Sequence, residues 1–246
     1  MPVDTDVDAK TDWHSQEQFV ARMRERREHP RIPTPLTVWY HVACMGNWRD
    51  VLYEQVEVFQ DVGLSPRACV LGLPADIEHV KKFMPVAYSS PDWLEYETPT
   101  LQLLWEWCTS NQDGAVLYVH TKGVSNPADA NKAAWRKLMM QHVVCPWEGN
   151  LKSLEVADLV GIDWQDSPNY PHFSGNFWMA RADWVSHLCS PDEYRTSGGP
   201  PIAGHPWERM HAEMWIGSKQ WHHIENLCCR NENLWAGNRV FQLLAM

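Results

Sequence analysis

Residues 111–123 read NQDGAVLYVHTKG, and this stretch indicates both the fold class and the place of a functional site. A polar turn leads into an apolar run, which is typical of a buried strand. The run stops at His120 and Lys122, and Gly123 follows. Ligands of α/β proteins gather at the carboxyl ends of strands, and glycine lets the backbone approach a ligand closely. An imidazole and an ammonium at such an end predict an anionic ligand such as a phosphate.

On the N-terminal side of this stretch, apolar runs alternate with segments of helical spacing. Asn47 is expected to cap the helix that follows the first run, and Thr98 or Thr100 to cap the helix that reaches Cys108. Strands that alternate with helices indicate parallel βαβ units. The predicted strands cover residues 36–43, 67–73 and 85–90, and further predicted helices cover 13–29, 48–62 and 75–83.

On the C-terminal side the predicted strands come closer together, which favours a small antiparallel addition to the sheet. Strands are predicted at 158–164 and 173–180, helices at 127–144, 148–157, 182–188 and 207–215, and a loop at 197–206. We therefore expect an α/β fold with a mostly parallel central sheet that is flanked by helices. The predicted organisation is a tail and helix at 1–35, with residues 1–12 disordered, followed by one domain at 36–246.

Composition narrows the class of protein. A formal net charge of −10 argues mildly against a non-specific grip on duplex DNA, which needs a basic stripe. No apolar run is long enough for a transmembrane helix, and the acidic start, MPVDTDVDAKTD, is unlike a secretory signal. The seven cysteines contain no CxxC pair and read as reduced thiols. These features predict a cytoplasmic protein without a membrane span.

Four segments in order resemble glycosyltransferases of the GT-A type, which are nucleotide-sugar-dependent enzymes with a Rossmann-like sheet. The order of the segments is similar to that in a small group of glycosyltransferase-like proteins of bacteria and large viruses. The resemblance extends over roughly residues 36–225. The segments are LTVWYHVACMGNWRDVLYEQ from residue 36, LYVHTKG from 117 with AAWRKLM from 133, HFSGNFWMARADWV from 172 and HAEMWIGS from 211.

The resemblance implies a donor site. In the family the first strand holds the nucleotide, and the middle strand usually ends in Asp-x-Asp, whose carboxylates hold a divalent metal. This chain has His120, Thr121 and Lys122 there instead. We therefore expect no required cofactor and no metal ligands, with Mn²⁺ or Mg²⁺ as the open alternative. The residues expected to bind the donor and its phosphates are Tyr40, His41, Val42, His120, Lys122, Gly123 and Arg136.

The resemblance also implies a sugar and acceptor site. Glu213 aligns with the family's acidic residue that removes the proton of the attacking hydroxyl, and Asp163 is the alternative base. The late pair His222 and His223 is an alternative metal ligand, as in some members of the family. The residues expected to contact the sugar or the acceptor are Ser174, Gly175, Asn176, Trp178 and Trp215.

The implied function is the transfer of a sugar from a nucleoside diphosphate sugar, with a UDP-sugar as the expected donor, to a hydroxyl acceptor on a glycan or a small molecule. Two alternatives remain open. The acceptor is a hydroxymethylated base in phage-type DNA in the first, with the many tryptophans as stacking partners. The protein is a non-catalytic nucleotide-sugar or carbohydrate-binding module in the second, which the missing Asp-x-Asp supports.

Overall fold

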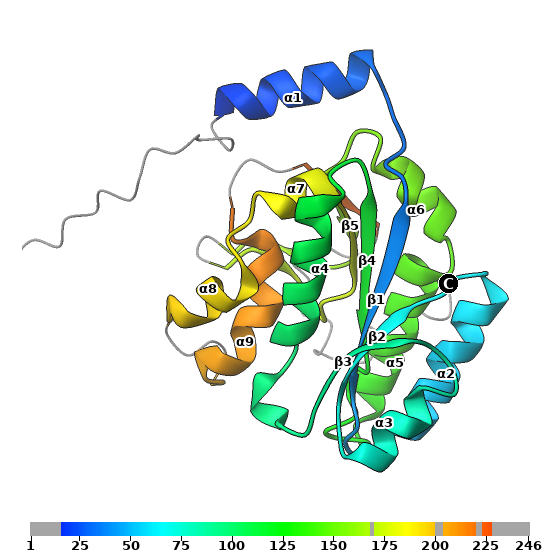
Figure 1. Ribbon diagram of the computed structural model, residues 1–246. Coiled ribbons are helices and arrows are strands. Elements are labelled where there is room, and N and C mark those ends of the chain that lie inside the picture. Colours follow the sequence, from blue (N-terminus) through cyan, green and yellow to red (C-terminus); the bar gives the residue numbers. More distant parts are fainter. Residues whose placement is uncertain (1–15, 168–169, 200–203, 220–222, 228–246) are drawn as a thin grey trace, which may run out of the picture.

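The computed structural model of the protein describes residues 16–167, 170–199, 204–219 and 223–227. Within these ranges a central sheet has seven strands (Figure 1). Their order is β3 (Val86–Ser90), β2 (Arg67–Leu71), β1 (Leu36–Ala43), β4 (Ala115–His120), β8 (Trp178–Arg181), β5 (Leu159–Gly161) and β9 (Ile224–Asn226). All neighbours are parallel except at β8, which runs antiparallel to β4 and β5. A small antiparallel sheet pairs β6 (Trp164–Gln165) with β7 (His172–Phe173).

Helices cover both faces of the sheet (Figure 1). One face carries α2 (Trp48–Asp61), α3 (Pro74–Val80), α5 (Ala130–Met139) and α6 (Trp147–Ser153). The other carries α4 (Thr98–Ser110), α7 (Ala182–Ser186), α8 (Pro191–Thr196) and α9 (Trp207–Met214). Short helical turns lie at Trp93–Glu95 and Trp215–Gly217, and a π-helical turn at Met140–Val144 extends α5.

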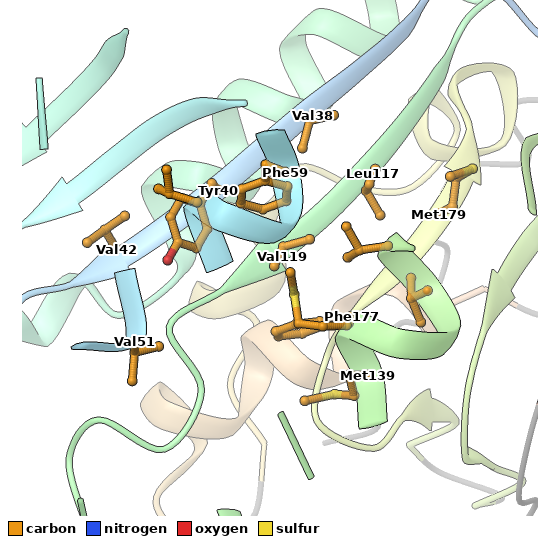
Figure 2. Close-up of a cluster of buried hydrophobic side chains, with 14 of the residues drawn as sticks. Val38, Tyr40, Val42, Val51, Phe59, Leu117, Val119, Met139, Phe177 and Met179 are labelled. Carbon is orange, nitrogen blue, oxygen red and sulfur yellow. The ribbon is translucent and has the colours of Figure 1, made fainter. Parts of the chain in front are cut away.

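Two hydrophobic cores follow from the period-two alternation of the buried strands. Val38, Tyr40 and Val42 of β1 face α2 and α5, together with Leu117 and Val119 of β4 (Figure 2). The intervening residues of both strands face α4 and α9 instead, among them Trp39, Val116 and Tyr118. The predicted α/β class, with a mostly parallel sheet, flanking helices and a small antiparallel addition, is confirmed.

The predicted elements need correction at turns where the backbone leaves extended geometry. The predicted strand 158–164 is two strands, because Asp163 has a φ of 52° between them. The predicted strand 173–180 is likewise interrupted, because Gly175 and Asn176 have φ values of 86° and 60°. Such values lie in the left-handed region, which ends a strand.

Several helices also differ in detail from the predicted ones; the N-cap of α4 is Glu97, not Thr98 or Thr100. The side chain of Asn47 makes no capping hydrogen bond, since its backbone leaves the extended geometry that a cap needs. Helix α5 begins at Ala130 because Asp129 accepts from two backbone N–H groups of its first turn. Helix α8 was not predicted, although Ser190 and Glu193 form a capping box there. The predicted disorder of residues 1–12 lies outside the described residues.

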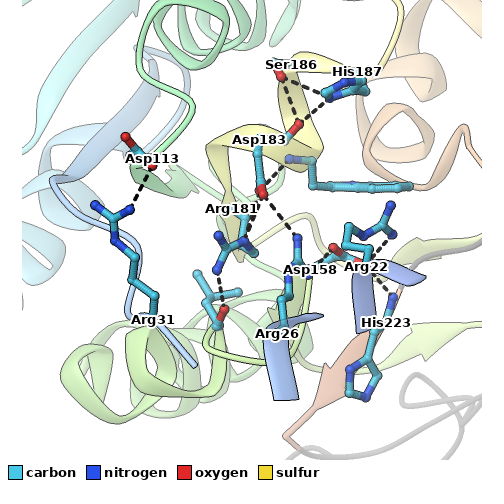
Figure 3. Close-up of polar contacts among 12 residues, drawn as sticks. Arg22, Arg26, Arg31, Asp113, Asp158, Arg181, Asp183, Ser186, His187 and His223 are labelled. Atoms are coloured by element: carbon cyan, nitrogen blue, oxygen red, sulfur yellow. Dashed lines mark hydrogen bonds and ion pairs between the residues drawn. The ribbon is translucent and has the colours of Figure 1, made fainter. Parts of the chain in front are cut away.

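Helix α1 (Gln16–Glu28) is held to the body by buried charges (Figure 3). The carboxylate of Asp158 is fully buried and accepts from Arg26 at 2.6 Å and from Arg22 at 3.1 Å. The backbone N–H of His223 donates to the same carboxylate, and Arg26 also reaches Asp183. Across the described residues, no helix has both the length and the apolar character that a membrane crossing requires.

We expect Arg26→Ala to destabilise the protein by about 3–5 kcal/mol, because it removes the closest partner of a buried carboxylate. Arg31→Ala is the matched control. Arg31 pairs with Asp113 at 3.4 Å, but both side chains are more than two-thirds exposed, at 71% and 78%, so the expected change is under about 1 kcal/mol. Urea denaturation measures both. Equal midpoints for the two variants would contradict a structural role for the buried pair.

Candidate functional site

Two histidines lie at or near the carboxyl ends of neighbouring strands, at the same edge of the sheet. His41 of β1 and His120 of β4 are paired in register. The chain leaves β1 toward β2 on one side, while β4 lies on the other, so this edge is a point where the strand order reverses. Crevices outside such a point bind ligands in open α/β sheets. The alternation of the strands directs both rings toward the face covered by α4 and α9.

A cavity of about 750 Å³ opens at this edge. Its volume lies within the range of about 300–1,000 Å³ that small-molecule sites occupy. Segments far apart in the sequence line it, namely the ends of β1 and β4, the loop after β3, the turn before β8, and α9. The predicted site residues that line it are His41, His120, Lys122, Gly123, Ser174, Gly175 and Glu213.

The turn at Gly175 and Asn176 connects the other groups of the cavity. The N–H of Gly175 donates to Glu213 at 2.6 Å, and its carbonyl accepts from Nε2 of His120 at 2.9 Å. The side chain of Asn176 donates to Glu97 at 2.7 Å. This turn requires glycine, because a Cβ at Gly175 would lie 2.4 Å from the indole nitrogen of Trp135 and the φ is 86°.

Glu97 is a second carboxylate of the cavity. It lies directly before α4 and follows Tyr96, whose φ of 49° is unusual for a residue with a side chain. Its Oε2 accepts from the hydroxyl of Tyr118 at 2.6 Å and from Asn176. Burial alone would raise the pKa of Glu97, yet the pKa lies below its usual value because the ionised carboxyl is favoured by His120 and His41, which are charged at the acid pH where Glu97 titrates, by the Tyr118 hydroxyl and by the ammonium of Lys122. Glu97 is therefore ionised at neutral pH.

The other carboxylate of the cavity, Glu213, lies near the positive charge of Lys122. Nζ of Lys122 lies 3.9 Å from Oε1 of Glu213, and both side chains are about one-fifth exposed, at 20% and 21%. Burial would raise the pKa of Glu213, but Lys122, His172 and the Gly175 N–H together lower it. Glu213 is thus also a carboxylate at neutral pH, with donors and a positive charge beside it.

The two histidines at the strand ends are neutral. Burial lowers the pKa of His41 to about 4, and its Nδ1 lies 2.8 Å from the hydroxyl of Thr100. Burial also lowers the pKa of His120. Fixed positive charge in the cavity therefore comes from Lys122, together with Lys132 and Arg209 at its wall.

Three residues that were predicted to bind the donor, Tyr40, Val42 and Arg136, do not line the cavity. Tyr40 and Val42 point to the opposite face of the sheet, where Tyr40 donates to Gln55 at 2.7 Å. Arg136 is buried and pairs with Glu54, and its Nη1 donates to the carbonyl of Lys122 at 2.8 Å. Arg136 thus holds the loop that carries Lys122, and its own charge is not directed at a ligand.

The remaining predicted residues are buried behind the cavity. Trp178 donates to the side chain of Asn176 at 2.8 Å, and Trp215 donates to the carbonyl of Cys189. Asn176 does not line the cavity either, but its side chain donates a hydrogen bond to Glu97, which does. Asp163 is almost fully buried at 1% exposure, and its Oδ1 accepts from Gln165 at 2.6 Å. It does not line the cavity, so it is not placed to act as the base.

Sequence reasoning missed several residues that line the cavity, namely Trp93, Tyr96, Glu97, Thr121, Lys132, His172, His205 and Arg209. One signal for Glu97 was present, because it follows the predicted strand 85–90 and thus lies near the same edge of a parallel sheet. Its partners Tyr118 and Asn176 come from distant segments, which no local pattern shows.

No cluster of three or more metal-ligating side chains occurs among the residues that the structure describes. Of the late histidine pair, His222 lies outside the described residues. His223 contacts the carbonyl of Val156 and the carboxylate of Asp158 near α1, and it does not line the cavity.

One protein family matches the chain. It is described as "Domain of unknown function (DUF8361)", and its sequence model matches residues 89–241. The matched range includes Glu97, the end of β4, the Gly175 turn and α9, whereas β1 and β2 precede it. Among curated proteins, no match was found.

We expect Gly175→Ala to destabilise the protein by about 2–5 kcal/mol, the sum of a left-handed backbone penalty and overpacking against Trp135 and Met139. Gly198→Ala is the matched control, because Gly198 also has a positive φ, 72°, but nothing lies near its Cβ position. The control should lose only about 1–2 kcal/mol. Urea denaturation measures both variants, and equal losses would show that the close approach to α5 is unimportant.

Proposed function

The chain belongs to the DUF8361 family, a domain of unknown function, and we propose that it is a glycosyltransferase that moves a sugar from a nucleoside diphosphate sugar to a hydroxyl group. One observation carries the proposal. The cavity at the reversal of strand order brings together Lys122, Gly175 and Glu213 from three of the four segments in which the sequence resembles that enzyme class. Their separation in the chain makes a chance grouping in one cavity a poor explanation.

The positive charges of the cavity suit a diphosphate. Lys122 follows β4 directly, and its loop is fixed by Arg136 and by Thr121, whose hydroxyl accepts from the backbone N–H of Ala43 at 2.9 Å. Lys132 and Arg209 also line the cavity. A preorganised ammonium stabilises the negative charge that develops on a departing diphosphate. We assign the diphosphate to the Lys122 loop on this basis.

The carboxylates suit the other half of the reaction. Glycosyl transfer passes through a transition state that resembles an oxocarbenium ion, and the attacking hydroxyl must lose a proton. Glu97 and Glu213 both line the cavity and both are ionised. Each is fixed by the Gly175–Asn176 turn, so a sugar between them would meet two oriented acceptors. The proposed donor is a UDP-sugar.

We also propose that the reaction needs no divalent metal. The end of β4 carries His120 and Lys122, and the imidazole of His120 is already hydrogen-bonded to the carbonyl of Gly175. A lysine neutralises a phosphate as a point charge, without the oxygen ligands that Mg²⁺ and Mn²⁺ require.

A second candidate is a non-catalytic module that binds nucleotide sugars. The contact between Lys122 and Glu213 favours it, because each group partly neutralises the other. Binding of a nucleotide sugar without release of the nucleotide would support this candidate against the enzyme.

We expect one member of a panel of UDP-glucose, GDP-mannose, dTDP-glucose and a CMP-sugar to raise the Tm of the protein, because a ligand that binds only the native state stabilises it. Lys122→Ala should weaken that binding about 10- to 100-fold, which corresponds to the loss of one charged contact. Lys152→Ala, at an exposed position of α6, is the control and should bind like the wild type. Equal binding by Lys122→Ala would contradict the assignment of the diphosphate.

The same thermal-shift measurement tests the metal. We expect the increase in Tm to persist in EDTA and to change little on addition of Mn²⁺, because Lys122 supplies the positive charge. A shift that appears only with Mn²⁺ or Mg²⁺ would show that the site recruits a metal with the bound nucleotide.

A further inference from the structure

The hydrogen bonds of His120 fix where its ring carries a proton. Nε2 lies 2.9 Å from the carbonyl oxygen of Gly175. A carbonyl can only accept, so Nε2 carries the hydrogen. Burial lowers the pKa of His120, so the ring is neutral at neutral pH and its Nδ1 bears a lone pair.

That lone pair faces a second acceptor. Oε1 of Glu97 lies 3.5 Å from Nδ1 of His120. The other oxygen of Glu97 is already occupied, because Tyr118 donates to it at 2.6 Å and Asn176 at 2.7 Å. These two donors prevent the carboxylate from rotating away. Two acceptors thus face each other at the cavity wall, and the gap between them suits one additional proton.

Glu213 differs from Glu97 in the groups that its Oε1 faces. Its Oε1 accepts from the N–H of Gly175 at 2.6 Å and lies 3.9 Å from the ammonium of Lys122. Both carboxylates accept from donors and are influenced by Lys122, but their Oε1 atoms face different groups: a proton on Oε1 of Glu213 would lie against the N–H of Gly175 and the ammonium of Lys122, whereas a proton on Oε1 of Glu97 would lie against the lone pair of His120. Glu213 is therefore suited to hold Lys122 and the turn in place.

We propose that Glu97 and His120 together accept the proton of the attacking hydroxyl, and that Glu213 is a positioning residue. The proposal rests on the proposed glycosyltransferase function. The acceptor oxygen bonds to the anomeric carbon, and the bond from that carbon to the diphosphate oxygen breaks with its electron pair on the diphosphate. The hydroxyl proton passes to Oε1 of Glu97 and is shared with Nδ1 of His120.

The charged and titratable groups around the pair set the direction of its pH dependence. Glu97 and Glu213 raise the pKa of His120, whereas burial and Lys122 lower it, and burial is the largest effect. His41 on the adjacent strand is neutral, and the phenol of Tyr118 is a donor to Glu97. The pair is unprotonated at neutral pH and gains its proton below the ordinary histidine pKa of about 6.5. Activity should therefore fall on the acid side as the pair becomes protonated.

Glu97→Gln is the decisive variant, because a glutamine satisfies every neighbour. Its carbonyl oxygen can accept from Tyr118 and Asn176, and its amide can donate to Nδ1 of His120. The variant should therefore fold, but an amide hydrogen then occupies the position between Glu97 and Nδ1 of His120 that the transferred proton would take. We expect kcat for nucleotide release from the panel sugars, with water as the acceptor, to fall about 10²- to 10⁴-fold, with the donor-induced increase in Tm retained. The acid limb of the pH profile should disappear.

Glu213→Gln is the comparison. A glutamine there still accepts from the N–H of Gly175, but it no longer holds the charge of Lys122. We expect KM for the donor to rise and kcat to change less than about 10-fold. A loss of kcat in this variant with wild-type kcat in Glu97→Gln would overturn the proposal, because the proton would then go to Glu213.

A ligand-free measurement separates this inference from the proposed function. ¹⁵N NMR of labelled histidine, assigned with His120→Gln, should show Nε2 of His120 protonated and Nδ1 unprotonated at pH 7.5. Glu97→Gln should move the titration of His120 to lower pH by about one pH unit or more. A proton on Nδ1 at pH 7.5, or an unchanged titration, would overturn the proton site. If the NMR result holds and no panel sugar binds or reacts, the proposed function is wrong and the role in transfer falls with it.

Discussion

The left-handed turn at Gly175 and Asn176 determines the geometry of the cavity. Its backbone contacts Glu213 and His120, and its Asn176 side chain contacts Glu97. These partners come from α9, β4 and the residue before α4, so one turn fixes three elements relative to one another. The turn in turn depends on the absence of a side chain at Gly175, where α5 packs against the backbone. The packing of α5 against Gly175 therefore also determines the positions of the side chains that line the cavity.

The reversed strand β8 explains why the turn lies at the cavity. In a parallel sheet the carboxyl ends of the strands share one edge. A strand that runs antiparallel to them begins at that edge, and the residues before Trp178 are delivered beside His120. On its other side β8 pairs with β5, so the sheet continues beyond β8. One reversed strand thus adds a third segment to a crevice that β1 and β4 alone would leave open.

Elements that a single segment determines were predictable from the sequence, and contacts between segments were not. The apolar runs at 36–43 and 115–119 become β1 and β4 because continuous burial needs continuous apolar residues. Alternation could have excluded Tyr40 and Val42 from the cavity, since neighbours of His41 on a strand must face the other way. The position of Glu97 after the predicted strand 85–90 indicated only the edge of the sheet; its contact with Asn176 could not be predicted, because Asn176 lies 79 residues further along the chain.

Helix α1 lies at the end of the molecule where β1 begins (Figure 1), whereas the cavity lies at the carboxyl ends of β1 and β4. Asp158 precedes β5, and Asp183 follows the end of the reversed strand β8, so both of its anchors belong to the amino-terminal edge of the parallel strands. A solid support that captured the protein through this helix would leave the mouth of the cavity facing the solvent. Immobilisation at that end therefore suits surface-based screening of small soluble ligands and of large, slowly diffusing macromolecules alike.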